Sequence, residues 1–210
     1  MFGKERTFYA RYKQGLESDR GLFDEVLGAI AEVLSRYNTT VFENRFIVGG
    51  VVEQIIGASA RALELNVHNA GKQNQGYDIE LDDSQETGIS IKGVFASTSG
   101  HHNLVNTRGS NEGRDLASLW TTSTLFVMSG VGIGYTDPEL GGEFLHPTAD
   151  ALQISGGGLQ RWWNENPEWI IRADVPPKSS GPATRVASDA VAWDVFANFE
   201  RLKKHWSPEI

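Results

Sequence analysis

Two polar residues, Asp78 and Lys92, have the types and the spacing needed to hold a divalent cation beside a water molecule. Asp78 opens a strand-like run, and Lys92 lies on the apolar run that follows it. Because side chains alternate between the faces of a strand, Asp78 and Glu80 point away from Ile79 and Leu81. If the two runs pair as a hairpin with their apolar faces aligned, Asp78 and Lys92 emerge on one side. They then form either a reactive site or a surface salt bridge.

Ser90 shares the face of Lys92, and Glu53 is a further candidate carboxylate. Glu53 interrupts an apolar run at 44–66, where glycines at helical neighbours leave open space in front of it. Glu80 and Glu64 are possible substitutes. Each residue also has a purely structural interpretation: Asp78 ends a turn, Lys92 is half-buried beside a structural partner, and Glu53 lies on an exposed helix surface.

Composition limits the chemistry that this chain can use. With 210 residues, 40% of them hydrophobic and 22% charged, it is typical of one soluble globular domain spanning 1–210. Apolar runs stay below the ~18 residues of a membrane span, and the first residues do not resemble a signal peptide. We therefore expect a cytoplasmic protein with no membrane partner. Because the chain has no cysteine, any metal must be bound by oxygen or histidine.

The charge distribution is uneven. A net charge of −8 argues against a protein that coats nucleic acid nonspecifically, since that behaviour needs a broad positive field. The stretch from Lys92 to Arg114 nevertheless contains only one acid, Glu112. A second basic patch lies in the N-terminal segment and comprises Lys4, Arg6, Arg11, Lys13 and Arg20.

Hydrophobic periodicity predicts the elements that must position these residues. Apolar residues at helical spacing predict N-terminal helices within 21–66, and alternating or continuous apolar runs predict strands. Two strands are predicted within 76–95, and further strands are predicted at 125–129, 152–155 and 169–175. Helices are predicted at 159–164 and from Ser188 onward. Region 76–130 thus holds the candidate strands, and 150–206 holds further strands and helices. This order predicts an α/β fold with a mixed central sheet flanked by helices on both faces.

Two short segments invite other interpretations. Gly130, Gly132 and Gly134 are expected to loosen the chain after the strand at 125–129. The run of glycines at 156–158 is expected to form a strand-to-helix turn, because no Gly-Lys-Ser/Thr follows it as a phosphate-binding loop requires.

The helices, the acid on a first core strand and the Ser-Ile-Lys triplet on a second resemble the PD-(D/E)XK nuclease superfamily. In size and layout the chain is most similar to type II restriction endonucleases. The resemblance covers 45–130 by motif and the whole chain by element order. It implies a restriction-endonuclease-like fold in which Asp78 binds Mg²⁺ and Lys92 positions or polarises the attacking water. It also implies that Glu53 adds a carboxylate, with the Ile91 carbonyl and waters completing the metal site.

Two positions depart from the family pattern. Tyr77 stands where the family has proline, and Ser90 stands where it has Asp or Glu, so one metal ligand is missing from its usual place. Some members carry serine there and recruit a carboxylate from a helix, which gives Glu53 its importance. The family resemblance therefore implies a catalytic set of Asp78, Lys92, Glu53 and Ser90.

The polar stretch at 97–114 is too long to be an idle connection in a compact domain. Arginine grips guanine and asparagine grips adenine through paired hydrogen bonds, so this loop suits contacts with DNA, although a solvated loop fits equally well. Adjacent histidines seldom face one metal, so we expect them to contact phosphate or water. The candidate DNA-binding residues are His101, His102, Asn103, Asn106, Thr107, Arg108 and Arg114.

The expected function is Mg²⁺-dependent hydrolysis of double-stranded DNA at a specific sequence. We expect a homodimer, because a two-fold enzyme places one site on each strand of a palindrome. A catalytically inactive DNA-binding module of the same fold is the main alternative, and Ser90 is the argument for it. A second alternative is an α/β enzyme acting on a small molecule, with Asp78 and Lys92 as a structural pair and a closed pocket away from the polar loop.

Overall fold

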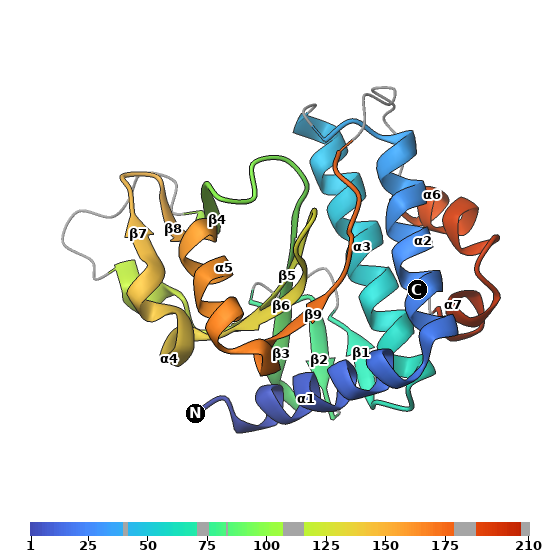
Figure 1. Cartoon of the computed structure of the whole chain (residues 1–210), viewed down its shortest axis with the longest axis horizontal. Helices are drawn as coiled ribbons and strands as arrows, with labels where there is room; N and C mark the ends of the chain where they lie inside the picture. The colour runs from blue at the N-terminus through green and yellow to red at the C-terminus, as the bar shows by residue number, and fades with distance from the viewer. Residues whose placement is uncertain (40–41, 71–75, 83, 107–115, 179–187, 207–210) are drawn as a thin grey trace.

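The computed structural model describes residues 1–39, 42–70, 76–82, 84–106, 116–178 and 188–206 (Figure 1). The helices are α1 (Gly3–Ser18), α2 (Arg20–Arg36), α3 (Phe42–Ala62), α4 (Pro138–Gly141), α5 (Gly156–Glu165), α6 (Ser188–Phe196) and α7 (Glu200–His205), with 3-10 turns η1 (Leu116–Leu119), η2 (Gly142–Phe144) and η3 (Pro167–Trp169). The strands are β1 (Val67–Asn69), β2 (Ile79–Leu81), β3 (Ser84–Val94), β4 (His101–Asn106), β5 (Ser123–Met128), β6 (Gly132–Thr136), β7 (Leu145–Pro147), β8 (Ala151–Ser155) and β9 (Ile170–Arg172).

The central sheet is mixed, as the sequence predicted. Its strand order is β1-β2-β3-β5-β6-β9, in which β3 and β5 pair in parallel and the other neighbours pair antiparallel. Strands β4, β8 and β7 form a separate three-stranded sheet. The structure is thus mixed α/β. Its membership of the restriction-endonuclease-like fold stays a prediction.

Helices cover both faces of the central sheet (Figure 1). On one face, α1, α2, α3, α6 and α7 enclose the larger hydrophobic cluster, which includes Ile89, Ile91 and Leu125. On the other face, α5 and the small sheet enclose a second cluster with Phe126 and Trp163. No helix of the described residues has both the length and the apolar character to span a membrane.

Side chains of strand β3 point alternately to the two faces of the central sheet, and this alternation positions the candidate site. Ile89 and Ile91 are 0% and 5% exposed in the helix-side cluster. Ser90 and Lys92 alternate with them, so they face the second cluster and the small sheet. Parallel pairing places Ser90 beside Thr124 of β5. The hairpin expected between the two runs is confirmed, because Ile79 pairs antiparallel with Ile89.

The structure corrects the sequence prediction in four places. The N-terminal basic segment forms α1, whose tyrosines Tyr9 and Tyr12 are fully buried. The polar stretch after residue 97 is not simply a loop, because His101–Asn106 forms β4 on β8; only one side of this strand is buried, so it looks polar in sequence. The last predicted helix is two helices, α6 and α7.

The fourth correction concerns β6, where Gly132 and Gly134 belong to a buried strand, whereas Gly130 lies in the exposed turn before it. A Cβ on Gly134 would lie 2.4 Å from the Trp163 ring, so the missing side chain lets this ring pack on the strand. The Trp163 Nε1 also donates to the Tyr135 carbonyl at 2.9 Å. Glycine here serves close packing and not flexibility.

Ion pairs neutralise much of the N-terminal basic patch. Arg6 donates to both carboxylate oxygens of Asp137, at 2.8 and 3.0 Å, and to Glu139 at 2.7 Å. The Asp137 side chain is fully buried and also accepts from the first backbone N–H groups of α4. Lys13 pairs with Glu17, and Arg20 pairs with Asp24. Arg6 thereby fastens α1 to the end of β6.

Replacing Arg6 should destabilise the fold, because it leaves the buried Asp137 carboxylate without its cation. We expect Arg6→Ala to lower the free energy of unfolding by about 2 kcal/mol. Arg20→Ala is the control, since its pair with Asp24 spans 3.9 Å between side chains that are 71% and 68% exposed. The control should change the free energy by less than about 0.5 kcal/mol in urea denaturation. Equal losses in both variants would contradict this account of Asp137.

Candidate active site

The carboxylate of Asp78 is fastened to β3. Asp78 lies directly before the first residue of β2, and its backbone N–H donates to the Ile89 carbonyl of β3 at 3.0 Å. Beyond it, Asp78 Oδ2 accepts from the Ile91 N–H at 2.6 Å and from the Ser90 hydroxyl at 3.1 Å. The side chain therefore takes the place of a backbone acceptor, and within the described residues Oδ1 has no hydrogen-bond partner.

Asp78, Ser90 and Lys92 line one cavity of about 350 Å³, which we name the Asp78 cleft. The segment directly before β2 contributes Asp78 to this lining, β3 contributes Ser90 and Lys92, and further lining residues come from β4, η1 and the start of β5. The other lining residues are Gly76, Tyr77, Leu104, Val105, Asn106, Leu119, Trp120, Thr121, Thr122 and Thr124. Three of the four residues predicted as catalytic thus meet in one place.

Lys92 is half-buried in this cleft. Within the part of the chain that the structure describes, its ammonium has neither a hydrogen-bond partner nor an ion-pair partner, and it does not pair with Asp78. The interpretation of Asp78 and Lys92 as a structural salt bridge is therefore wrong. A partly desolvated cation is costly without an anion, so the cleft is suited to an anionic ligand.

Hydroxyl groups make up a further part of the lining, and the sequence analysis did not identify them. Thr121, Thr122 and Thr124 lie at the start of β5. Trp120 Nε1 donates to Thr124 Oγ1 at 3.3 Å, which fixes that hydroxyl beside Ser90. The available signal was the Thr-Thr-Ser-Thr run directly before a continuous apolar strand.

Glu53 is half-buried on α3 and is not among the residues that line the cleft. It lies beside Gly49, as expected: a Cβ there would be 4.0 Å from Glu53 Oε1. Glu80 is half-buried on β2, and Glu64 is exposed in a left-handed turn after α3. Among the described residues, no group of three or more His, Asp or Glu side chains is placed to hold a metal. Roles for Glu53 and the Ile91 carbonyl as metal ligands stay predictions.

The predicted DNA-binding residues divide into three sets. Asn106 lines the Asp78 cleft, and His101, His102 and Asn103 line a neighbouring pocket. Thr107, Arg108 and Arg114 lie outside the described residues. The asparagines are linked, since Asn103 Nδ2 donates to Asn106 Oδ1 at 2.9 Å and Gln153 Nε2 donates to Asn103 Oδ1 at 2.8 Å.

The adjacent histidines of β4 point to different surroundings. The ring of His101 is exposed and lies against His146 of β7, with 4.3 Å between ring centroids. His102 is half-buried, with Nε2 3.2 Å from the Thr98 carbonyl oxygen. Burial lowers the pKa of His102, so this ring is neutral at pH 7 and does not supply a cation to phosphate.

The glycines at the start of α5 form the expected strand-to-helix turn. Gly156 N–H donates to the Gly100 carbonyl at 2.8 Å, and Gly157 N–H donates to the Ser99 carbonyl at 3.2 Å. Gly158 N–H donates to the capping Ser155 hydroxyl at 3.1 Å. These donors are occupied by the protein itself, so this helix end is not a phosphate cradle.

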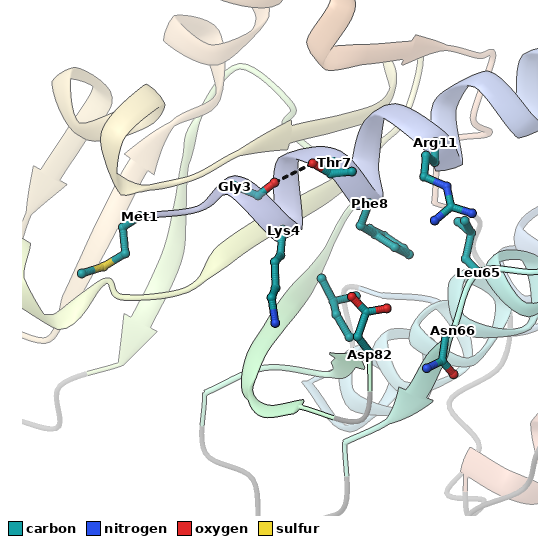
Figure 2. A pocket seen from close by; sticks show the side chains of 10 residues that line it. Met1, Gly3, Lys4, Thr7, Phe8, Arg11, Leu65, Asn66 and Asp82 are labelled. Carbon is teal, nitrogen blue, oxygen red and sulfur yellow. Dashed lines mark hydrogen bonds between the residues drawn. The ribbon is translucent and has the colours of Figure 1, made fainter.

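A third cavity of about 460 Å³ lies at the far end of β2 from Asp78 (Figure 2). Lys4, Thr7 and Arg11 of α1 line one side of it, and Asp82 and Asn66 lie across from them. It shares no residue with the Asp78 cleft. Its described lining contains two cations, Lys4 and Arg11, and one carboxylate, Asp82.

The Asp78 cleft combines a carboxylate oxygen, hydroxyl groups and an ammonium that has no partner in the described part of the chain. This set can bind a phosphate-bearing ligand together with a hard divalent cation. Comparisons with protein-family models, curated proteins and solved structures found no match to this chain. The functional argument therefore depends on the geometry of the cleft.

Gly88 keeps Asp78 in position, because it lies opposite Glu80 and under the Tyr77 ring. A Cβ on Gly88 would lie 2.3 Å from Tyr77 Cδ2 and 2.6 Å from the Ile79 carbonyl oxygen. Gly88→Ala should therefore push Tyr77 and Asp78 away from β3.

We expect Gly88→Ala to lower the free energy of unfolding by about 1–3 kcal/mol, as overpacking does. Urea denaturation measures this loss. Gly142→Ala is the control, because its added Cβ would meet nothing within 4 Å and its φ is −59°. If the Gly88→Ala protein is as stable as the Gly142→Ala protein, Tyr77 can move away from the added Cβ at little cost, and Gly88 is not needed to keep Asp78 in position.

Proposed function

We propose that this chain is a Mg²⁺-dependent endonuclease that hydrolyses double-stranded DNA at a specific sequence, as type II restriction endonucleases do. The observation that carries the proposal is the cleft shared by Asp78 and Lys92, in which the Lys92 ammonium has no partner among the described residues. A phosphodiester supplies the missing anion. The Ser-Ile-Lys triplet and its pairing with the strand after Asp78 support the same interpretation.

The donors of the cleft fit Mg²⁺ in kind. Mg²⁺ prefers oxygen ligands, keeps several waters, and is usually bound through one or two carboxylates plus substrate phosphates. Asp78 Oδ1 supplies one such oxygen, because Oδ2 is occupied by Ile91 N–H and the Ser90 hydroxyl. Glu53 and the Ile91 carbonyl are the further proposed ligands. When bound, the ion would neutralise charge on the phosphate and help generate hydroxide near pH 7.

Lys92 has two tasks in this proposal. Its ammonium donates a hydrogen bond to the attacking water and so holds the water in line with the phosphorus atom. Its charge also offsets the negative charge that grows on the phosphoryl oxygens in the transition state. Both tasks require a lysine that the protein has not already paired, as observed for Lys92.

Sequence recognition and dimerisation complete the proposal. Asn106 on the wall of the cleft and Asn103 beside it present amide groups suited to base edges. A homodimer would place one cleft on each strand of a palindromic site.

A catalytically inactive DNA-binding module of the same fold is the second candidate. One observation favours it: among the described residues that line the cleft, Asp78 is the only acid. Ser90, at the position where the family carries an acid, donates its hydroxyl to Asp78 instead of adding a charge. Such a module would need the cations of the cleft but not the metal.

Cleavage of a plasmid panel tests the proposal. The wild-type protein should give discrete fragments with Mg²⁺ and none with EDTA. Asp78→Asn and Lys92→Ala should each lower the cleavage rate by about 100-fold or more. Asp82→Asn and Lys203→Ala are matched controls at exposed positions, and asparagine tolerates the positive φ of 55° at Asp82. DNA that is bound but never cut by the wild type would favour the inactive module.

Ser90→Asp tests the metal site without an activity assay. The new carboxylate would lie beside Asp78, so mutual repulsion should lower the melting temperature in EDTA. Mg²⁺ should then raise the melting temperature of Ser90→Asp more than that of the wild type, because a ligand that binds only the folded state stabilises it. Ser90→Asn is the uncharged control. If Mg²⁺ stabilises both variants equally, the cleft is not the metal site.

A further inference from the structure

A second pocket continues from the Asp78 cleft beyond Lys92. It has a volume of about 570 Å³ and lies between the N-terminal half of α3 and strand β4. Lys92 belongs to both linings, so the two cavities are neighbours that meet at this residue, and we refer to them together as the path. We name this pocket the Arg45 branch, after the residue that α3 contributes to it.

In addition to Lys92, two segments distant in sequence contribute cations to the Arg45 branch. Arg45 lies near the start of α3, and its Nε donates to the Thr39 carbonyl at 2.9 Å. Lys178 lies on the segment after β9, and its backbone N–H donates to the Phe95 carbonyl at 2.9 Å. Both side chains are exposed. Within the described residues, neither has an ion-pair partner.

The segment that carries Lys178 is held by the ends of the central strands. Ser129 Oγ donates to the Pro176 carbonyl at 2.6 Å, and Gly130 N–H donates to the Val175 carbonyl at 2.9 Å. These bonds and that of Lys178 fix the segment across the ends of β3 and β5. The ammonium of Lys178 is therefore presented from an anchored backbone.

The described lining of the path has a net positive charge, whereas the chain as a whole has a net negative charge. Over the whole chain, 27 acids outnumber 19 lysines and arginines. Among the described residues that line the cleft and the branch, the cations Arg45, Lys92 and Lys178 outnumber the acids, of which Asp78 is the only one. A concave surface lined by one sign of charge concentrates the field and attracts a ligand of the opposite sign.

We propose that the Arg45 branch binds the backbone of the DNA strand that the Asp78 cleft cuts, on one side of the scissile phosphate. This inference rests on the proposed nuclease function. Arg45 keeps its terminal nitrogens for a phosphate, which a guanidinium grips with two parallel hydrogen bonds. Lys178 contacts a neighbouring phosphate as a point charge. The branch thereby orients the strand and places the scissile phosphate against Lys92.

The salt dependence of DNA binding tests this role. Affinities for a labelled random-sequence duplex are measured by fluorescence anisotropy over a range of salt concentrations, in the Asp78→Asn background so that no strand is cut. Each phosphate contact contributes about 0.9 to the slope of log K against log salt, so Arg45→Ala with Lys178→Ala should flatten it by about 1 to 2. Thermal unfolding should be unchanged, because both residues are exposed.

Lys4→Ala with Arg11→Ala is the matched control. It removes the same two kinds of charge from the cavity at the far end of β2 (Figure 2) and should leave the slope unchanged. Equal slopes for the two double variants, or no DNA binding at all, would overturn the branch assignment. Normal Mg²⁺-dependent cleavage with an unchanged slope would refute the branch and leave the nuclease. A flattened slope without wild-type cleavage would retain the branch and refute the nuclease.

Discussion

The two-sided burial of β3 is the constraint on which the rest of the structure depends. This strand lies between β2 and β5, and its isoleucines must enter the helix-side core. Because side chains alternate, the residues between them must face the other way. A shift of one residue would bury Ser90 and Lys92 among the helices and expose the isoleucines. The hydrophobic core thus fixes the register that places Lys92 in the cleft.

The same strand explains why the cleft exists. Strand β2 begins directly after Asp78, and the Asp78 carboxylate accepts from the Ile91 N–H of β3 in place of a backbone carbonyl. On the other side of β3, the parallel neighbour β5 begins with polar residues at the level of Ser90. The small sheet and η1 cover this region and provide the walls. Lys92 has no partner among the residues that the structure describes, and a partly buried cation without a partner lowers stability, so a functional role would account for a lysine here.

The elements around the cleft were predictable where periodicity is strong. Helices α2 and α3, the β2–β3 hairpin and β5 carry clear apolar patterns, so Asp78, Ser90 and Lys92 could be placed on one face from sequence. Strands β4 and β6 could not be predicted, because β4 buries one side only and Gly134 of β6 is needed where Trp163 packs on the strand. Helix α1 was not predicted, because its sequence is rich in charged residues, although its tyrosines Tyr9 and Tyr12 are buried.

The sequence also could not predict which residues distant elements contribute to the site. Arg45 and Lys178 reach the path by tertiary contacts that leave no local pattern, and Gln153 holds Asn103 from another strand. The position of Glu53 relative to the cleft depends on how α3 packs on the sheet, which its sequence does not specify. Short motifs therefore located the centre of the site, and the structure was needed for its surroundings.

The most direct test of the central claim is a crystal structure of the wild-type protein soaked with Mn²⁺ as a substitute for Mg²⁺, read from anomalous difference density. The account predicts one strong peak in the Asp78 cleft, about 2 Å from Asp78 Oδ1, that is absent in an Asp78→Asn crystal. A cleft without metal, or a peak bound by residues elsewhere, would contradict the claim that Asp78 and Lys92 form a metal-dependent catalytic site.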